Sequence, residues 1–101
     1  MSKVALWVKL DIKPGMREEA KAIIQEAIDA VEAEEGTLLY LLHEDPNDET
    51  VLYFYDAYSS PEALGAHSGS DWFKAYSPKL GTVLAGRPAM TMVTLVGGKG
   101  V

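Results

Sequence analysis

The sequence predicts an α+β fold in which four antiparallel strands and two helical regions follow one another in the order β-α-β-β-α-β. Apolar residues alternate with other residues in four separate stretches, as expected of strands. Between the first two stretches they instead recur every three or four positions, which is the period of an amphipathic helix. With 101 residues, the chain is expected to form one domain, residues 1–101, because two halves would each be too small to bury a core.

The first part of the chain predicts a strand followed by a long helix. The strand covers Lys3 to Ile12 and ends where Lys13-Pro14-Gly15 breaks the alternation. The helix is expected from Met16 to about Glu35, with Gly36 as a left-handed cap after its last turn. Its acidic residues are expected to form a solvated face, and they are Glu18, Glu19, Glu26, Glu32, Glu34 and Glu35.

The middle of the chain predicts a hairpin and a short helix. Two strands, Thr37 to Glu44 and Thr50 to Tyr58, flank a polar turn. Ser60 is expected to cap the next helix, with Pro61 at its first position. This helix should end near His67, because glycine and serine residues follow it.

The last part predicts a broken helical region and a final strand. Helix resumes at Asp71, but Ser77-Pro78 and Gly81 indicate that it is broken again before Leu84. The strand is expected over Ala89 to Val96, with residues 97–101 as a loose tail. This order of elements is that of the ferredoxin-like fold, with the helices on one face of the sheet.

Both faces of the predicted strands are apolar. In the second strand, Leu39 and Leu41 alternate with Leu38, Tyr40 and Leu42. A single sheet covered on one side should be polar on the other, and a face like this would expose a larger apolar patch than soluble monomers usually carry. We therefore expect a homodimer, a dimeric α/β-barrel in which the two sheets pack face to face.

Composition excludes several classes of function. The net charge of −6 would repel nucleic acid and anionic membranes. The absence of cysteine excludes disulfides, thiol catalysis and cysteine-ligated metals. No apolar run approaches the ~20 residues of a membrane span, and no leader segment opens the chain, so a cytoplasmic protein is expected.

Aromatic residues gather in one region, residues 51–76, which holds seven of the nine Phe, Trp and Tyr residues. It also holds His67, whose imidazole is a candidate general base because it titrates near neutral pH. The alternative is a histidine that only interacts with the carbonyl end of its helix. Trp72, Phe73 and Tyr76 follow it at spacings that suit either a core or a flat apolar pocket.

Two further polar residues are weaker candidates. Asp56 lies within the aromatic strand and could orient His67 as an acid-base partner, although a structural role is the favoured interpretation. His43 is expected at the surface, because no cluster of ligands accompanies it and two isolated histidines do not form a metal site.

Several segments together resemble the antibiotic biosynthesis monooxygenase family. They are KPGMREEA after the first strand, Glu35-Gly36-Thr37, YFYDAYSSPEALGAH, and the Ser70, Phe73 and Lys74 positions that follow. The resemblance runs from Val4 to Gly98 and is nearest to the small, stand-alone quinol monooxygenase type. It departs from the family where Asp56 replaces a frequent Glu and Tyr58 a frequent Trp.

The resemblance implies a dimer with a shared barrel and a pocket between sheet and helices. It also implies oxidation of a quinol or phenol by O2 without metal, flavin or haem. On this reading His67 is the base, and Tyr55, Trp72 and Phe73 line the substrate. Haem degradation is set aside, because the positions that would serve it hold unsuitable residues.

Two alternatives remain open. One is a small-ligand binding or dimerisation module without catalysis, since a fold does not fix a function. The other is an isomerase of a phosphorylated signal molecule, a second activity of the same family. That enzyme must hold a phosphate, for which Lys74 and Arg87 are the available cations.

Overall fold

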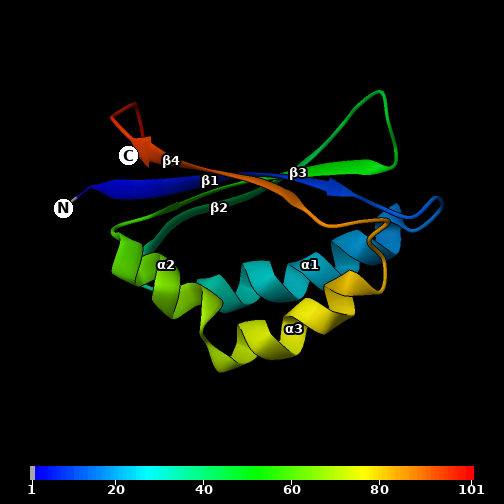
Figure 1. Ribbon diagram of the computed structural model, residues 1–101, viewed down its shortest axis with the longest axis horizontal. Helices are drawn as coiled ribbons and strands as arrows, with labels where there is room; N and C mark the ends of the chain where they lie inside the picture. Colours follow the sequence, from blue (N-terminus) through cyan, green and yellow to red (C-terminus); the bar gives the residue numbers. More distant parts are fainter. Residues whose placement is uncertain (1) are drawn as a thin grey trace.

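The computed structural model describes residues 2–101 and shows one antiparallel sheet with helices on one side (Figure 1). The strands are β1 (Lys3–Asp11), β2 (Thr37–Glu44), β3 (Val51–Tyr58) and β4 (Ala89–Leu95), in the spatial order β2-β3-β1-β4. The helices are α1 (Arg17–Val31), α2 (Pro61–Ser68) and α3 (Asp71–Gly81). The predicted ferredoxin-like arrangement is confirmed, and the strand boundaries agree with the predicted ones within one residue.

Strand register divides the sheet into two faces, which we call the inner face, toward the helices, and the outer face. Asp56 in the middle of β3 is paired with Leu6 on one side and Tyr40 on the other, and all three belong to the inner face. Tyr55, one position earlier, is paired with Trp7 and Leu41. Because side chains alternate along a strand, this second row belongs to the outer face.

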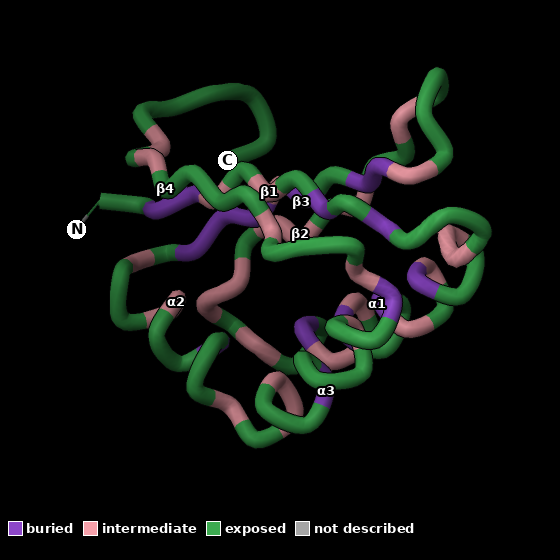
Figure 2. Tube along the Cα trace, turned by 45° about the vertical axis from the view of Figure 1, so that its right-hand side comes forward, coloured by how far each residue is buried: buried purple, intermediate pink, exposed green. Residues whose placement is uncertain are grey.

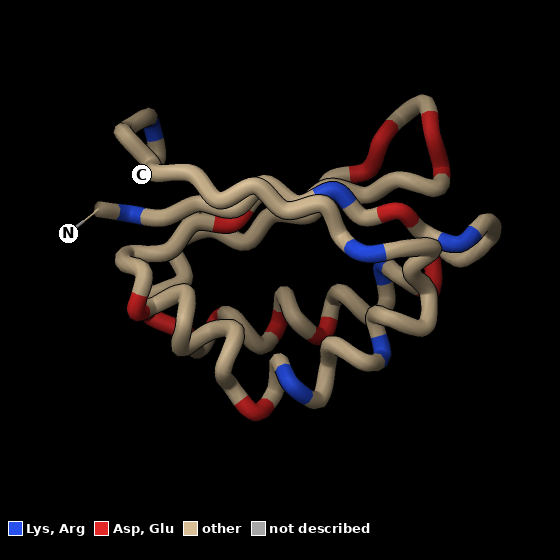
Figure 3. The backbone as a smooth tube through the Cα atoms, in the orientation of Figure 1, with Lys and Arg blue, Asp and Glu red and all other residues tan. Residues whose placement is uncertain are grey.

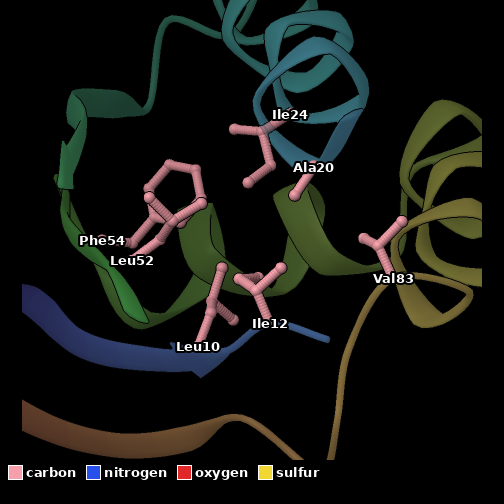
Figure 4. Close-up of a cluster of buried hydrophobic side chains, with 7 residues drawn as sticks. All are labelled: Leu10, Ile12, Ala20, Ile24, Leu52, Phe54 and Val83. Atoms are coloured by element: carbon pink, nitrogen blue, oxygen red, sulfur yellow. The ribbon is translucent and has the colours of Figure 1, made fainter. Parts of the chain in front are cut away.

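The core lies between α1 and the inner face, toward the end of β1 that leads into α1 (Figure 4). Buried residues of β1, β3 and α1 and of the segments that follow β1 and α3 form it: Leu10, Ile12, Ala20, Ile24, Leu52, Phe54 and Val83. On α1 the buried positions are Ala20, Ile24, Ala27 and Val31, which are three or four residues apart. Figure 2 shows buried positions on the two central strands, β1 and β3, and on α1.

The first helix is shorter than predicted and ends at Val31. Tight turns follow it, in which the amide of Glu34 donates to the Val31 carbonyl at 2.9 Å. The prediction for Gly36 was also wrong, since its φ is not positive. Glycine is needed there because a Cβ atom would lie 2.6 Å from the Cβ of Ala63 in α2. Close packing of two segments, rather than a helix cap, therefore determines this residue.

The second helical region divides as predicted at Ser68-Gly69-Ser70, but α3 then continues through Pro78 to Gly81. The predicted second break was wrong. Pro78 removes the hydrogen bond to the Lys74 carbonyl and crowds that carbonyl, but both residues are exposed, so water can replace the lost bond. Serine caps begin both helices, since Ser60 accepts from the Ala63 amide and Ser70 from the Phe73 amide.

Charged residues lie mainly on the helices and loops, with an acidic cluster on the β2–β3 loop (Figure 3). Within residues 2–101, no helix has the length and apolar character needed to cross a membrane.

Candidate functional site

A cavity of about 630 Å³ lies between the inner face and the pair α2 and α3. Its walls come from all four strands and both helices, and most of them are apolar. The apolar residues include Leu6, Val8, Leu64, Leu80, Met90 and Met92. Few polar side chains reach the cavity, among them His67, Asp56 and Tyr76. A largely apolar hollow with a few polar groups is typical of a small-molecule site.

His67 occupies the last turn of α2 and is 5% exposed. Four aromatic rings surround its imidazole, with centroid distances of 5.0 to 5.5 Å: Tyr40, Tyr58, Trp72 and Phe73. Its backbone carbonyl accepts a hydrogen bond from the Ser70 hydroxyl at 2.8 Å. The histidine is therefore held by packing as well as by its helix, and it is not a frayed residue at a helix end.

The side-chain partner of His67 is Glu34, from the turns after α1. Glu34 Oε1 lies 2.8 Å from His67 Nδ1 and accepts from the Thr37 hydroxyl at 2.7 Å. Glu34 Oε2 accepts from the indole N–H of Trp72 at 2.9 Å. One carboxylate thus joins the end of α1, the start of β2, α2 and α3.

These donors determine the charge of Glu34 and the tautomer of His67. Burial raises the pKa of Glu34, but hydrogen bonds from His67, Thr37 and Trp72 outweigh it, so the pKa lies below its usual value. An ionised carboxylate only accepts hydrogen bonds, so Nδ1 must carry the proton. In a neutral imidazole the lone pair is then on Nε2, which has no hydrogen-bond partner within residues 2–101. This is the arrangement that a general base requires.

Glu34 is the main residue that the sequence analysis missed, because it was assigned to the solvated face of the first helix. A signal was present in the spacing. The buried positions Ala27 and Val31 continue with the helical step to Glu34, which places a carboxylate in line with the apolar stripe. A charged residue at such a position is more informative than one on the polar face, because it needs a partner when buried.

Asp56 does not orient His67, contrary to one of the predicted possibilities. Its carboxylate accepts from the Tyr58 hydroxyl at 2.8 Å through Oδ2. The residue is 4% exposed, and burial raises the pKa of its carboxyl above the usual value, although the Tyr58 hydroxyl opposes that shift. The orienting partner of His67 is Glu34 instead, since its carboxylate already occupies Nδ1 of the histidine.

The three predicted substrate-lining residues have three different locations. Phe73 lines the cavity with His67. Trp72 packs edge-on against His67 at 5.4 Å, but it borders a second pocket, which is also lined by His67 and Glu34. Tyr55 lies on the outer face against Trp7, with 6.4 Å between ring centroids, so it is not part of this cavity. A one-residue step along β3 separates Tyr55 from Asp56 and from the site.

The remaining predicted residues lie away from the cavity. His43 is exposed and borders the outer face. Lys74 and Arg87 are exposed and do not line the cavity, so within residues 2–101 no lysine or arginine is placed there to hold a phosphate. The same part of the chain contains no cluster of three or more His, Asp or Glu side chains that could hold a metal ion.

Comparison with known proteins agrees with this architecture. The family model described as antibiotic biosynthesis monooxygenase matches residues 4–79. None of the curated proteins compared with the chain matches it. Among solved structures, a candidate antibiotic biosynthesis monooxygenase from Caulobacter crescentus CB15 is 27% identical with a TM-score of 0.88, over 95% of this chain and 92% of that one.

Two further structures are similar over nearly their whole length. The protein Rv0793 from Mycobacterium tuberculosis is 28% identical with a TM-score of 0.87, over 97% of this chain and 99% of that one. A candidate antibiotic biosynthesis monooxygenase from Chloroflexus aurantiacus J-10-fl has a TM-score of 0.84 over 96% of both chains. Its identity of 24% supports similarity of fold alone.

Proposed function

The chain belongs to the antibiotic biosynthesis monooxygenase family, and from that premise we propose that it oxidises a small quinol or phenol with O2, without a cofactor. The single observation that carries this proposal is a buried histidine that lines an apolar cavity while its Nδ1 is held by Glu34. Such a site combines a base with a largely apolar binding surface. These are the two things that a phenol needs from a protein in order to react with O2.

The proposed reaction begins with proton transfer from the substrate hydroxyl to His67 Nε2. The resulting phenolate is electron-rich at its ring carbons and supplies the electrons that reduce O2. One oxygen atom stays on the ring and the other leaves as water, so a phenol gives a quinone and a quinol gives a hydroxyquinone. Apolar walls such as Phe73 and Leu64 exclude bulk water and bring the ring close to the base. Removal of the proton within a positioned complex typically contributes ~10²–10⁴ in rate.

We also propose that the protein is a homodimer joined through its outer face. Trp7 is 60% exposed, Leu41 44% and Tyr53 38%, and they lie on neighbouring strands of that face. Two copies of such a face can cover each other, because a two-fold axis brings the same apolar residues together from both copies. Sedimentation equilibrium at micromolar concentration should give the mass of two chains, and the mass of one chain would contradict the proposal.

The activity is tested by O2 consumption with reduced naphthoquinones and polycyclic phenols. We expect protein-dependent uptake with at least one of them and a fall of about 100-fold or more in kcat for His67→Ala. Lys74→Ala is the control, because it removes an exposed side chain of α3 that does not line the cavity and should leave kcat unchanged.

The non-catalytic alternative gives a different result in the same experiment. If the protein only binds ligands, an aromatic ligand in the cavity should quench its tryptophan fluorescence, since Trp72 packs against His67. Binding would then persist in His67→Ala, and no substrate would cause O2 uptake. Uptake that is equal in wild type and His67→Ala would instead contradict the assigned base.

A further inference from the structure

Two buried oxygen atoms at the cavity have no hydrogen-bond partner within residues 2–101. They are Asp56 Oδ1 and the hydroxyl of Tyr76, and each residue is 4% exposed. Buried polar atoms in folded proteins are nearly always paired, and an unpaired one is costly. Both residues line the cavity that contains His67. Their missing partners are therefore expected in the space that a ligand would occupy.

The chemistry of the two atoms limits what that partner can be. Asp56 Oδ2 is already taken by the Tyr58 hydroxyl, which leaves Oδ1 as an acceptor that needs a donor. Burial raises the pKa of the Tyr76 hydroxyl, so this group stays protonated and can donate or accept. The surrounding wall is apolar, including Leu6 on the neighbouring strand. A fitting ligand has an apolar ring body and an O–H group that reaches Asp56.

We propose that Asp56 Oδ1 is a specificity-determining acceptor, which binds a hydroxyl of the substrate and selects hydroxylated aromatics over their ethers and quinones. This rests on the proposed function, because it concerns the same cavity. His67 supplies one acceptor and Asp56 a second, so the preferred substrate is an apolar aromatic with two hydroxyl groups, one for each acceptor. Oxygenation of such a quinol gives a hydroxyquinone and water, so the product has one hydroxyl for two acceptors and should bind more weakly than the quinol.

The test measures binding rather than turnover, so that it is independent of the oxygenase activity. The probes are 1-naphthol and its ether 1-methoxynaphthalene, and the readout is tryptophan fluorescence under nitrogen. In wild type we expect naphthol to bind about tenfold more tightly than the ether. In Asp56→Asn the preference should disappear or reverse, because the Tyr58 hydroxyl can bond the amide oxygen and turn the NH₂ donor into the cavity.

Two control variants separate the role of Asp56 from that of His67 and from loss of structure. Asp56→Glu keeps a carboxylate and should retain the preference for naphthol over the ether. His67→Ala should retain the share of that preference that depends on Asp56. Wild-type protein with ¹³C-labelled aspartate carboxyls gives a test without any variant. Within residues 2–101, Asp56 is the only aspartate that lines the cavity, so one buried carboxyl signal should shift with naphthol and not with the ether.

The outcomes are distinct for the two proposals. Equal affinity for naphthol and ether in wild type, or an unchanged preference in a folded Asp56→Asn, would overturn the assignment of Asp56. Uptake of O2 with quinols in that case would leave the oxygenase proposal standing. A preference that depends on Asp56 in a protein that never consumes O2 would support the acceptor and contradict the oxygenase.

Discussion

The two faces of the sheet are built from the same strands, yet they differ in what they bury. The outer face carries large exposed rings, with Trp7 beside Tyr55 and Tyr53 further along β3. The inner face encloses His67 and Asp56 within apolar walls, and both are almost fully buried. Neighbouring residues of one strand, Tyr55 and Asp56, belong to opposite faces. Aromatic rings occur on both sides of the sheet, so it is the buried polar groups, His67 and Asp56, that distinguish the side where chemistry is proposed.

Electrostatics follow the same division. On the inner side, Glu34 is ionised beside His67 because three donors surround it. Asp56 is instead placed in an environment that opposes its charge, with a single donor. Two carboxyls near one histidine thus have pKa values shifted in opposite directions, a pattern that is frequent where groups have separate roles. On the outer face His43 is exposed, and no ion pair is found for it within residues 2–101.

The largest effect is expected from placing a charge on the outer face. In the proposed dimer, Leu41→Glu would bury an unpaired carboxylate between the two copies, at a cost of several kcal/mol. Sedimentation should then show a single chain whose fold, by circular dichroism, is retained. Ala75→Glu adds the same charge at an exposed position of α3 and should leave the mass unchanged. A Leu41→Glu protein that keeps the mass of wild type would show that this face is not the interface.

A smaller effect, on the free energy of unfolding, is expected from crowding the contact between Gly36 and α2. Gly36→Ala places a Cβ atom 2.6 Å from that of Ala63, and such overpacking typically costs about 1–3 kcal/mol. Gly65→Ala is the matched control, because nothing lies within 4 Å of its added methyl group. Within α2 that change should stabilise the protein by about 0.5–1 kcal/mol. Urea denaturation measures both, and equal stabilities would contradict the close approach.

Glu34→Gln tests whether the carboxylate positions His67. An amide has one oxygen, so it cannot accept from both His67 and Trp72 as Glu34 does. We expect kcat to fall on the order of tenfold with little change in KM, by analogy with partners that orient other reactive groups. Glu35→Gln changes an exposed neighbour and should have no effect. A fall in KM and kcat together, or in stability alone, would indicate a purely structural role.

The smallest effect is the contribution of Glu34 to stability at different pH values. Its pKa is lower in the folded state than in the unfolded chain. Its contribution is therefore present above the unfolded value of about 4.5 and is lost as pH falls through the folded value. Wild type should exceed Glu34→Gln by on the order of 1 kcal/mol in urea denaturation at pH 7. The gap should narrow as pH falls below the unfolded value, and a gap that is constant with pH would contradict the ionised state.

Much of the fold could be predicted from the sequence, because strand alternation, helical spacing and capping serines are local signals. β2 was predicted residue for residue, and Ser60 caps α2 as expected. The errors occurred where distant segments meet. Gly36 depends on Ala63, and Glu34 on His67 and Trp72. Neither relation has a period along the chain, so neither can be seen without the packed structure.

The sequence by itself determined the order of elements, the two apolar faces of the strands and the choice of His67 as the leading candidate. These features follow from local patterns, in which each residue is read together with its near neighbours in the sequence. Only the tertiary structure decided which rings share the cavity with that histidine and which carboxylate holds it. The physical reason is that contacts of Glu34, Asp56 and Tyr55 depend on strand register and on how α1 ends, both of which are fixed by packing across the whole domain.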